Sequence, residues 1–527
     1  MQRSELLQRL RGVERHDLIV VGGGATGLGL ALDAAQRGLR VALLEAEDFA
    51  KGTSSRATKL LHGGVRYLGQ GQIGLVREAL HERSTVLANA PHLASSLPFV
   101  MPARHWWEAP FYGIGLKTYD LLAGRRSLGP TEWLGRERAA ALLPGLSTEG
   151  LRAGVRYWDA QFDDARLALA LARSSLRLGA TVLNHCAVEG LLHEDGPAGL
   201  RVAGVRARER ESGEAFELRA ACVVNATGVW VDALREQDAQ GAGRTPGAPM
   251  VQPSQGVHLV VDADFLQSDH ALLVPRTDDG RVLFAVPWLG ATLLGTTDTP
   301  RRDLPLEPEA LHEEVEFILG ESAKYLRRAP QRADVRSVWV GMRPLVRPDK
   351  EDGADTGALS REHSVRVSRS GLVTVTGGKW TTYRPMAEDV LARCVAAGLL
   401  PPLPPCATAH LTLVGAQAGG PPVSAAPGLH GYGSEAETVQ ALPGAGRWLW
   451  SGRLSEAMVR FAVRHELARS VEDVLARRSR MLFLDAAQAE AQADAVAAIV
   501  CDELGGAPPL LGLDAFKALA RRYRHIP

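Results

Sequence analysis

Cysteine is scarce in this chain and widely scattered. Five cysteines occur in 527 residues, and no two of them form a C-x-x-C pair. They are Cys186, Cys222, Cys394, Cys406 and Cys501. Disulfide scaffolds, zinc ribbons and iron–sulfur sites need clustered or regularly paired cysteines. The pattern therefore argues against all three, predicts no metal site, and suits a reducing cytosol.

Long hydrophobic runs and net charge are also missing. The N-terminal stretch MQRSELLQRLRGVER holds no unbroken apolar segment, so we expect no cleaved signal peptide. No run approaches the ~20 apolar residues of a membrane-spanning helix. Sixty basic residues balance sixty acidic ones, so the chain lacks the basic excess that attracts nucleic acid. We expect a soluble body and no nucleic-acid partner.

The chain does have enough apolar material for a large core, since 46% of its residues are hydrophobic and 23% are charged. The length predicts two or three domains. Residues 1–400 mix predicted strands and helices, among them a strand over 181–191 and an alternating pattern typical of an antiparallel sheet over 258–298. Residues 401–434 are rich in proline and glycine, which predicts a linker, and residues 435–527 are rich in alanine, arginine and leucine, which predicts a helical domain.

The N-terminal region predicts a dinucleotide-binding βαβ unit. Residues 17–45 read as a buried strand, a glycine turn, a helix and a second, parallel strand that ends at Glu45. Gly22, Gly24 and Gly27 match G-x-G-x-x-G, in which the glycines permit a tight turn, close approach to a pyrophosphate, and close helix–strand packing. Glu45 is placed to accept a ribose hydroxyl and would repel a 2′-phosphate, so NADP is disfavoured.

This motif alone does not separate NAD from FAD. Its N-terminal position favours FAD, and so do two later glycine turns, NATG at 225–228 and GGKWTT at 377–382. A flavin is wrapped by segments that lie far apart in sequence, whereas a nicotinamide site needs mostly its first half-domain. We therefore expect FAD.

Several stretches resemble the FAD-dependent glycerol-3-phosphate dehydrogenases, a family of glutathione-reductase-like flavin oxidoreductases. They include LHGGVRYL (61–68), FDDARL (162–167), NATGVWVD (225–232), GMRPL (341–345) and GGKWTTYR (377–384). LHGGVRYL and GGKWTTYR are specific to this family rather than to flavoproteins at large. Two small departures are Val229, where proline is usual, and Trp380, where leucine is common.

The resemblance implies an α/β fold with a glutathione-reductase-like FAD-binding Rossmann domain. Over residues 1–400 this domain would be interleaved with an antiparallel-sheet substrate domain, and a C-terminal helical domain would follow. The resemblance also implies FAD, sn-glycerol 3-phosphate as substrate, dihydroxyacetone phosphate as product, and a membrane quinone as electron acceptor. We accordingly expect a respiratory enzyme of glycerol metabolism, cytoplasmic and peripherally associated with the inner face of the cell membrane. We also expect a homodimer.

The reaction needs cations for the substrate phosphate and one group to take a proton. Arg66 and Arg343 stand beside glycines rather than on helix faces. Each would otherwise be an ordinary solvated cation, but the resemblance favours them as phosphate anchors, with Arg343 also catalytic. Tyr67 and Thr297 are weaker candidates for hydroxyl contacts to the substrate.

Two residues compete for the role of catalytic base. His258 opens the predicted strand HLVVDAD, and its type suits proton transfer near neutral pH. A lone histidine at a strand start is more often structural, but the resemblance favours it as the base. Lys379 lies in the second glycine turn, where it would have a lowered pKa or stabilise negative charge on a reduced flavin.

The remaining candidates are expected to line the flavin site. Two serines after Glu45 are placed to touch the pyrophosphate or ribityl chain. Two threonines open the last helix of the 371–398 segment, where backbone N–H groups stabilise an anionic ring edge. The predicted set is Ser54, Ser55, His62, Gly378, Thr381 and Thr382.

Aromatic clusters at 105–122 and 447–454 fit either membrane-facing patches or core packing.

Other functions also stay open. A glycerol-3-phosphate oxidase would use the same substrate residues and reduce O₂ to H₂O₂. An amine or D-amino acid oxidase would need an arginine for a carboxylate. A non-catalytic FAD-binding or RNA-associated protein is a third alternative, and the zero net charge argues against RNA.

Overall fold

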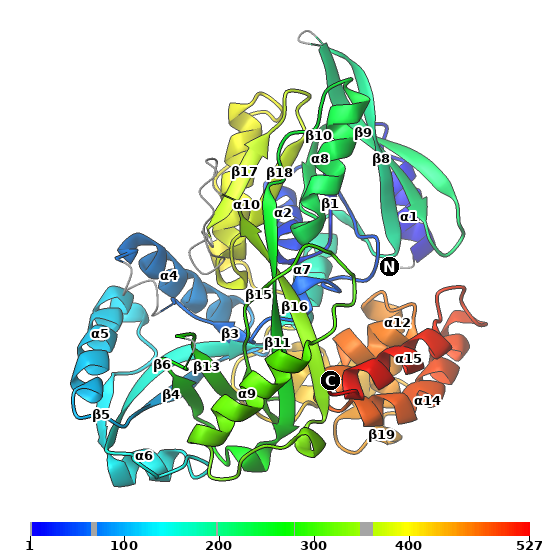
Figure 1. Ribbon diagram of the computed structural model, residues 1–527. Coiled ribbons are helices and arrows are strands. Elements are labelled where there is room, and N and C mark those ends of the chain that lie inside the picture. Colours follow the sequence, from blue (N-terminus) through cyan, green and yellow to red (C-terminus); the bar gives the residue numbers. More distant parts are fainter. Residues whose placement is uncertain (1–2, 65–70, 197–198, 279, 348–361) are drawn as a thin grey trace.

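The computed structural model describes residues 3–64, 71–196, 199–278, 280–347 and 362–527. Within these residues, two large sheets and a set of C-terminal helices form the molecule (Figure 1). The helices are α1 (Arg3–Arg11), α2 (Ala25–Gln36), α4 (Ile73–Asn89), α5 (Glu108–Ala123), α6 (Arg136–Leu142), α7 (Asp164–Arg177), α8 (Val231–Gly241), α9 (His312–Tyr325), α10 (Tyr383–Ala396), α11 (Ala436–Gln440), α12 (Glu456–His465), α13 (Met481–Leu484), α14 (Ala486–Leu504) and α15 (Leu513–Arg524).

The strands vary from two-residue pairs to long ribbons. They are β1 (His16–Val21), β2 (Val41–Leu44), β3 (Leu60–Leu61), β4 (Ala94–Ala103), β5 (Glu132–Gly135), β6 (Ala153–Phe162), β7 (Thr181–Leu183), β8 (Cys186–Gly196), β9 (Gly199–Glu209), β10 (Ala215–Asn225), β11 (Val251–Asp262), β12 (Ala271–Val274), β13 (Leu283–Trp288), β14 (Ala291–Gly295), β15 (Thr299–Pro300), β16 (Ser337–Val346), β17 (His363–Val367), β18 (Val373–Gly377), β19 (Trp448–Trp450) and β20 (Leu454–Ser455).

The first sheet is mainly parallel, with strand order β17-β18-β10-β1-β2-β7. The central strand β1 pairs in parallel with β10 on one side and β2 on the other, so that Val20 lies opposite Val224 and Leu43. Leu18–Val21 are all buried, as expected for a parallel strand covered on both faces. Helix α2 packs against α7 and α10, and the β8–β9 hairpin continues the sheet from β10 (Figure 1).

The second sheet is mainly antiparallel and is built around the long strand β11, which pairs with β14, β15 and β16. Successive side chains on a strand point to opposite faces. Leu259 and Val261 accordingly join the core under α9, whereas Val260 and Trp339 join the core shared with the C-terminal helices. Both faces of this sheet are therefore covered.

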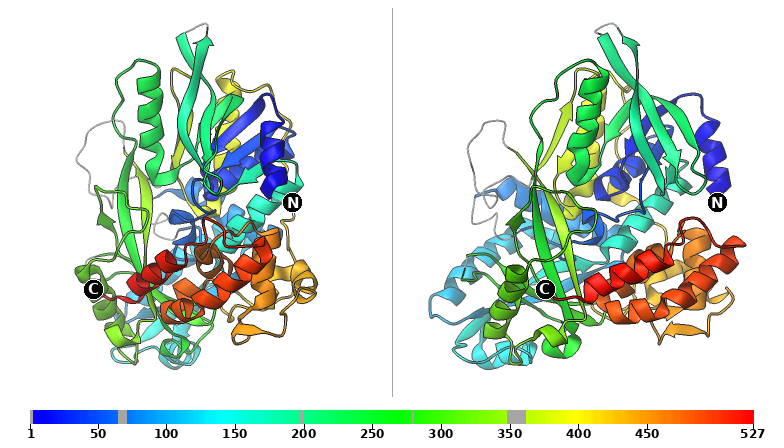
Figure 2. Two further views of the ribbon diagram at one scale, coloured as in Figure 1. Left: turned by 90° about the vertical axis from the view of Figure 1, so that its right-hand side faces the viewer. Right: turned by 45° about the vertical axis from the view of Figure 1, so that its right-hand side comes forward.

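The C-terminal helices pack beside the second sheet, with α13 and α15 against β16 (Figure 2). The preceding residues 401–434 contain only short 3-10 turns, at Thr408–His410 and from Leu429. Leu413 is buried in the core of the first sheet and Val423 in that of the second. The boundaries at residues 400 and 434 stay predictions.

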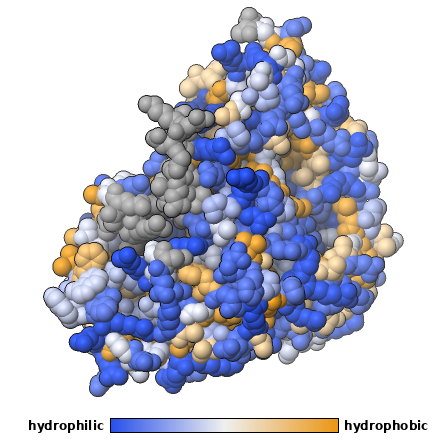
Figure 3. Space-filling view, in the orientation of Figure 1, coloured by the Kyte–Doolittle hydropathy of each residue, from blue (hydrophilic) through white to orange (hydrophobic). Residues whose placement is uncertain are grey.

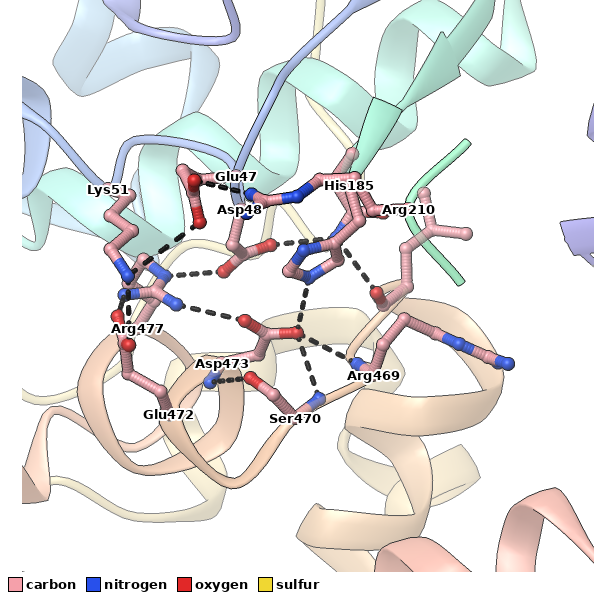
Figure 4. Close-up of polar contacts among 12 residues, drawn as sticks. Glu47, Asp48, Lys51, His185, Arg210, Arg469, Ser470, Glu472, Asp473 and Arg477 are labelled. Atoms are coloured by element: carbon pink, nitrogen blue, oxygen red, sulfur yellow. Dashed lines mark hydrogen bonds and ion pairs between the residues drawn. The ribbon is translucent and has the colours of Figure 1, made fainter. Parts of the chain in front are cut away.

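Buried ion pairs join the C-terminal helices to the first sheet (Figure 4). Arg477 Nε donates to Asp48 Oδ2 at 2.5 Å, and Arg478 pairs with the same carboxylate. His185 Nε2 lies 2.9 Å from Asp473 Oδ2. Ligand atoms of Asp48, His185 and Asp473 lie within 4.8 Å of one another, a spacing that suits a metal ion, but the two guanidinium groups already neutralise the carboxylates. We call these five residues the buried ion-pair network.

The architecture confirms the predicted α/β fold class, and β11, β13 and β14 confirm the antiparallel pattern expected over 258–298. Two local predictions were wrong. Residues 181–191 form two strands, because the backbone turns at His185, whose φ is +49°, to direct its side chain into the buried ion-pair network. His258 lies inside β11 rather than at its start, because β11 already pairs with β16 from Val251 onward despite Pro253 and Gly256.

No helix within the described ranges has both the length and the apolar character that crossing a bilayer requires.

Candidate functional site

A cavity of about 580 Å³ lies where the two sheets meet. Its walls include the carboxyl ends of β1, β2, β10 and β18, the edge at which ligands bind in parallel α/β sheets. Across the cavity stand residues of β11 and β16 from the antiparallel sheet, including His258 and Arg343. The glycine turn of the predicted dinucleotide-binding unit therefore lies across the cavity from a wall of charged and polar side chains.

The first glycine turn is shaped by backbone contacts that exclude side chains. Gly22 has a φ of +110°, and a Cβ there would lie 2.6 Å from the carbonyl oxygen of Ala226. A Cβ on Gly27 would lie 1.9 Å from the carbonyl oxygen of Gly22, so helix α2 approaches β1 as closely as glycine allows. Gly22 and Gly24 line the cavity, and Gly27 supports them from the helix.

Glu45 and Ser54 line the end of the cavity at the first glycine turn, which we call the nucleotide end. The half-buried Glu45 carboxylate accepts the Gly23 N–H at 2.6 Å and the Glu47 N–H at 2.8 Å. Burial raises its pKa, and these two donors oppose that shift. Ser54 Oγ accepts the Ala25 N–H at 2.9 Å, which leaves its own proton to donate to a ligand. Both side chains line the cavity.

The second glycine turn lies at the other end. Gly377 and Gly378 have φ values of +81° and +74°, which only glycine adopts without strain. Thr381 lines the cavity, whereas the Thr382 N–H donates to the carbonyl oxygen of Lys379 at 3.1 Å. Trp380 Nε1 donates to the Ser54 carbonyl oxygen at 2.8 Å and so joins the two glycine turns.

These residues fit a bound FAD. The glycine turn leaves room for a pyrophosphate, and the start of α2 offers N–H groups and a positive helix end to it. Glu45 provides carboxylate oxygens for ribose hydroxyls. The cavity runs on from these residues to Gly378, Lys379 and Thr381, which would surround the flavin end.

Arg343 is held in the cavity wall by several acceptors. Its Nη1 donates to the Thr297 carbonyl oxygen at 3.0 Å and approaches Asp298 Oδ1 at 3.3 Å. Its Nη2 donates to Thr296 Oγ1 at 3.1 Å. The guanidinium is thereby oriented before any substrate arrives, as a phosphate anchor requires.

His258 is 2% exposed and lies beside Arg343 in the same wall. Its Nε2 lies 3.0 Å from Thr58 Oγ1, and its ring stacks on Trp339 with the ring centres 4.2 Å apart. Its Nδ1 has no hydrogen-bond partner among the residues that the structure describes. Burial, and then the positive charges of Arg343 and Lys59, hold the pKa of His258 well below 6.5. The imidazole is therefore neutral at physiological pH and able to accept a proton.

A buried lysine lies behind this wall. Lys59 is fully buried, and its Nζ donates to Asp164 Oδ2 at 2.7 Å and stands 4.6 Å from the centre of the Trp339 ring. Burial lowers its pKa to about 7; the attraction of Asp164 opposes this shift and the charge of Arg480 adds to it. Trp339 thus separates a buried cation from His258, and both contact the same ring.

The structure brings most of the predicted site residues together. Those that line the cavity are Gly22, Gly24, Glu45, Ser54, His62, His258, Arg343, Gly378, Lys379 and Thr381. Those that do not are Gly27, Ser55, Thr297 and Thr382. Arg66 and Tyr67 lie outside the described residues, and their proposed roles stay predictions.

Ser55 and Thr297 are already engaged elsewhere. The Ser55 carbonyl oxygen accepts from Lys59 and Arg480, and the residue is buried. Thr297 Oγ1 donates to Glu314 at 2.8 Å and accepts the Val257 N–H. Their neighbours Ser54 and Thr296 face the cavity instead.

Sequence reasoning missed Thr58, Thr296 and Lys59. Thr58 holds His258, Thr296 holds Arg343, and Lys59 is the buried cation behind Trp339. Each of the three lies within four residues of a predicted site residue. This closeness in sequence is the feature that could have indicated them. No periodicity distinguished them.

Two family models match this chain. Residues 17–384 match the FAD dependent oxidoreductase model, and residues 406–507 match the C-terminal domain of alpha-glycerophosphate oxidase. The two matches together extend over both sheets and most of the C-terminal helices.

Relatives are similar over nearly the whole chain. A mitochondrial glycerol-3-phosphate dehydrogenase of Homo sapiens is 40% identical over 522 residues, covering 93% of this chain and 70% of the relative. A mitochondrial counterpart from Arabidopsis thaliana is 40% identical over 529 residues, covering 92% and 82%. The solved glycerol-3-phosphate dehydrogenase of Bacillus halodurans, complexed with FAD, is 27% identical with a TM-score of 0.75, and the match covers 99% of this chain and 98% of that one.

Proposed function

Because the chain belongs to the family of FAD-dependent glycerol-3-phosphate dehydrogenases, we propose that it oxidises sn-glycerol 3-phosphate to dihydroxyacetone phosphate and passes the electrons to a membrane quinone. FAD is its cofactor. The observation that carries the proposed direction is the cavity itself, in which a neutral, buried His258 and an oriented Arg343 share one wall opposite the nucleotide loop.

Bound FAD supplies the two-electron oxidant that accepts a hydride from C2 of the substrate. The protein must then hold the phosphate and remove the hydroxyl proton. Arg343 offers its guanidinium to the phosphate, and Arg66 is proposed as the second anchor. Because Thr58 engages Nε2 of His258, Nδ1 is the atom that we assign to take the hydroxyl proton.

Lys379 is the rival base. It lies in the glycine turn at the flavin end and lines the cavity. In our proposal its ammonium group instead stabilises negative charge on the reduced ring, because a cation beside the ring lowers the energy of that state. His62, which follows β3 and also lines the cavity, is proposed to contact the flavin.

We further propose that the enzyme works at the inner face of the cell membrane, where a quinone is dissolved, as a peripheral and cytoplasmic protein. The homodimer that we expect stays a prediction, which sedimentation equilibrium of the FAD-loaded protein tests.

Anaerobic reduction tests the proposal. Glycerol 3-phosphate should bleach the yellow protein under argon, whereas glycine, a D-amino acid and unphosphorylated glycerol should not. Re-oxidation by a quinone analogue should then be much faster than by O₂. Faster re-oxidation by O₂ with release of H₂O₂ would make the protein an oxidase, and a flavin that glycerol 3-phosphate does not reduce would contradict the proposed reaction.

A further inference from the structure

Three charged side chains are buried together behind the cavity wall. They belong to Lys59, Asp164 and Arg480, and each residue is at most 1% exposed. Hydrophilic side chains otherwise cover much of the face shown in Figure 3, where water solvates them. Burying a charge is costly unless the charge is paired and hydrogen-bonded, so these three side chains must compensate one another. We call the three residues the Asp164 cluster.

The carboxylate of Asp164, at the start of α7, joins three segments of the chain. Its Oδ2 accepts from Lys59 Nζ at 2.7 Å and from the Ala57 N–H at 3.3 Å. Its Oδ1 accepts from Arg480 Nη2 at 3.1 Å. The carbonyl oxygen of Ser55 accepts from the same two cations, at 2.7 and 2.8 Å. The loop that precedes β3 is therefore tied at several points to α7 and to the C-terminal helices.

Both basic members of the cluster have a left-handed backbone. The φ of Lys59 is +66° and that of Arg480 is +63°. This conformation strains a residue that has a Cβ, and it persists only where the surrounding contacts enforce it. Strained residues of this kind are concentrated at functional sites. The backbone at both positions thus indicates more than ordinary core packing.

The Asp164 cluster lies directly against the groups that support His258. Thr58, the residue before Lys59, places its Oγ1 3.0 Å from His258 Nε2. Trp339 stacks on the imidazole, and Lys59 Nζ stands 4.6 Å from the centre of the Trp339 ring. Phe483 of α13 contacts the same tryptophan, with the ring centres 5.4 Å apart. Both supports of the imidazole are therefore in contact with the cluster or with the helix that follows it.

These supports decide which ring nitrogen is available to the substrate. In a neutral imidazole one nitrogen carries the hydrogen and the other accepts. When Nε2 carries the hydrogen and donates it to Thr58 Oγ1, Nδ1 keeps its lone pair. Nδ1 of His258 has no hydrogen-bond partner in the part of the chain that the structure describes. A displaced Thr58 would let the ring turn or change its tautomer.

We propose that Lys59 and Arg480 are positioning residues for the removal of the substrate proton. The Asp164 cluster fixes the loop that carries Thr58, and Thr58 in turn keeps Nδ1 of His258 directed at the substrate hydroxyl. Arg480 thereby makes the C-terminal helices part of the proton-transfer site. The inference rests on the proposed function, because it concerns the orientation of the base assigned there.

The charges of the two cations make their effects distinguishable. Burial, and then the charges of Arg343 and Lys59, lower the pKa of His258. The charges that act on Lys59 are those of its two cluster partners and of Asp163. Removing the Lys59 ammonium should therefore raise the pKa of His258 and move the loss of rate on acidification to higher pH. Removing Arg480 leaves that ammonium in place, so it should loosen the loop without moving the pH dependence upward.

Stopped-flow reduction of the FAD-loaded full chain by glycerol 3-phosphate across pH tests the proposal. Lys59→Met and Arg480→Met should each slow flavin reduction by at least ~10-fold. The half-saturating substrate concentration should change little, because Arg343 still holds the phosphate. Lys59→Met alone should move the loss of rate to higher pH, by on the order of 1 pH unit. Lys59→Arg should return it towards the wild-type position.

A second pair of variants serves where the loss of a buried charge prevents folding. Thr58→Val keeps the shape of the side chain and removes its hydroxyl, so it should slow reduction by ~10-fold. Thr58→Ser should stay within a few-fold of wild type. The matched control is Arg460→Met, which removes an arginine of α12 that pairs with Glu456 and Glu503. The control should reduce at the wild-type rate with the wild-type pH dependence.

NMR of ¹⁵N-labelled histidine gives a readout that does not depend on activity. The signals of His258, assigned by their loss in His258→Asn, should show the hydrogen on Nε2 in the FAD-loaded wild type. Thr58→Val and Arg480→Met should show a mixture of the two tautomers. The pKa of His258 followed in the same spectra should rise in Lys59→Met.

The outcomes separate this inference from the proposed function. Variants that match the wild type in rate, pH dependence and histidine signals would overturn the positioning role and leave the reaction standing. Equal slowing by Arg460→Met would also overturn it, because the effect would then be one of general stability. A wild type that glycerol 3-phosphate does not reduce would contradict the proposed reaction, and the histidine signals would still decide whether the cluster positions His258.

Discussion

At the scale of single residues, the positive charges of Arg343 and Lys59 set the electrostatic environment of His258 in the cavity wall. Arg343 and His258 share the wall, and the buried Lys59 stands behind Trp339. Each positive charge makes a further proton on His258 less favourable, which is why its pKa is lowered well below 6.5 after burial has had the largest effect. The same positive field favours an anionic substrate. One set of charges therefore attracts the phosphate and keeps the imidazole ready to accept a proton.

Arg343→Ala should raise KM for glycerol 3-phosphate and lower kcat/KM by ~30- to 1000-fold. A charge-assisted contact to a phosphate is lost, worth ~2–4 kcal/mol. The FAD content should be unchanged, because the guanidinium bonds to Thr296, Thr297 and Asp298 rather than to the nucleotide loop. Steady-state kinetics with flavin absorbance measures both.

Arg336→Ala is the matched control, since that arginine is 49% exposed and pairs with Asp262 on the surface. It should leave the kinetics unchanged. An Arg343 variant that retains full activity, or that loses its flavin, would show that Arg343 is not a phosphate anchor.

His258→Asn should slow flavin reduction by ~10²- to 10⁴-fold, the usual share of general base catalysis. Substrate binding, followed by the flavin spectrum, should change little. In the wild type the lowered pKa places the loss of rate on acidification well below pH 6.5. Stopped-flow reduction across pH measures this, with the exposed His312→Asn as control.

Lys379→Met decides between the two bases. If that variant abolishes reduction while the His258 variant stays within a few-fold of wild type, Lys379 is the base. His258 would then serve only to pack against Trp339 and Thr58.

At the scale of elements, the turn from β1 into α2 sets how closely a ligand approaches the backbone. The turn needs glycine at Gly22 for its φ of +110° and at Gly27 for the contact with the Gly22 carbonyl oxygen. Ser54, from a 3-10 turn at Thr53–Ser55, reaches back to the first N–H of α2. The nucleotide end is thus built from one βαβ unit and the loop that follows it.

Gly27→Ala should release FAD and lower the unfolding midpoint. Its Cβ would stand 1.9 Å from a backbone oxygen that cannot move without opening the turn. Flavin fluorescence after gel filtration and thermal unfolding measure the two effects.

Gly320→Ala on α9 is the opposite case. Around its Cβ there is open space in the described chain, and alanine stabilises a helix interior by ~0.5–1 kcal/mol over glycine. This variant should retain FAD and unfold slightly later. Retention of FAD by both variants would contradict the close packing proposed for the turn.

At the scale of the whole molecule, the C-terminal helices are held by charge as well as by apolar packing. Their core is continuous with one face of the second sheet through residues such as Trp339 and Phe483. The buried ion-pair network adds contacts to the first sheet (Figure 4). Because removing one partner of a buried pair is costly, we expect this network to help fix the relative placement of the parts.

Asp473→Asn should destabilise the protein by ~3–5 kcal/mol, since His185 and Arg477 would be left buried with a neutral amide. Asp494→Asn, whose carboxylate is 67% exposed beside Lys517, should cost less than ~1 kcal/mol. Chemical unfolding of both variants in parallel with the wild type measures the difference. Equal effects would show that the buried ion-pair network does not hold the helices in place.

The pH dependence of stability follows from the same pair. Burial lowers the pKa of His185, but Asp473 outweighs burial and raises it above 6.5. This contribution is fully present below pH 6.5 and is lost as pH rises through the raised value. The pKa of Asp473 is held well below 3.8, chiefly by His185 and Arg477 acting against burial. Its contribution is present above pH 3.8 and is lost as pH falls below that value. The pair should therefore stabilise most between about pH 4 and 6.5, and His185→Gln should flatten that part of the unfolding profile.

The sequence by itself determined the class of fold, the family and the flavin. The glycine turn, Glu45 and the two flanking strands belong to one βαβ unit, in which local spacing dictates geometry. The motifs from residue 61 to residue 384 carried the resemblance, and the relatives and the FAD-bound structure confirm it. Local pattern was sufficient here because neighbours in sequence are also neighbours in space.

Only the tertiary structure decided which residue of each motif faces the cavity. Ser54 rather than Ser55, and Thr296 rather than Thr297, line it, because adjacent residues point to different sides of the chain. Strand β4, with two prolines, and its partner β6 escaped the sequence patterns, since each residue of β4 pairs with a residue of β6 that lies far along the chain, from Phe162 opposite Ala94 to Ala153 opposite Ala103. In the sequence, the aromatic cluster at 105–122 was equally compatible with a core, whereas Trp106 and Phe111 are 80% and 65% exposed in the structure. Burial is a property of what packs against a side chain, and that depends on segments hundreds of residues away.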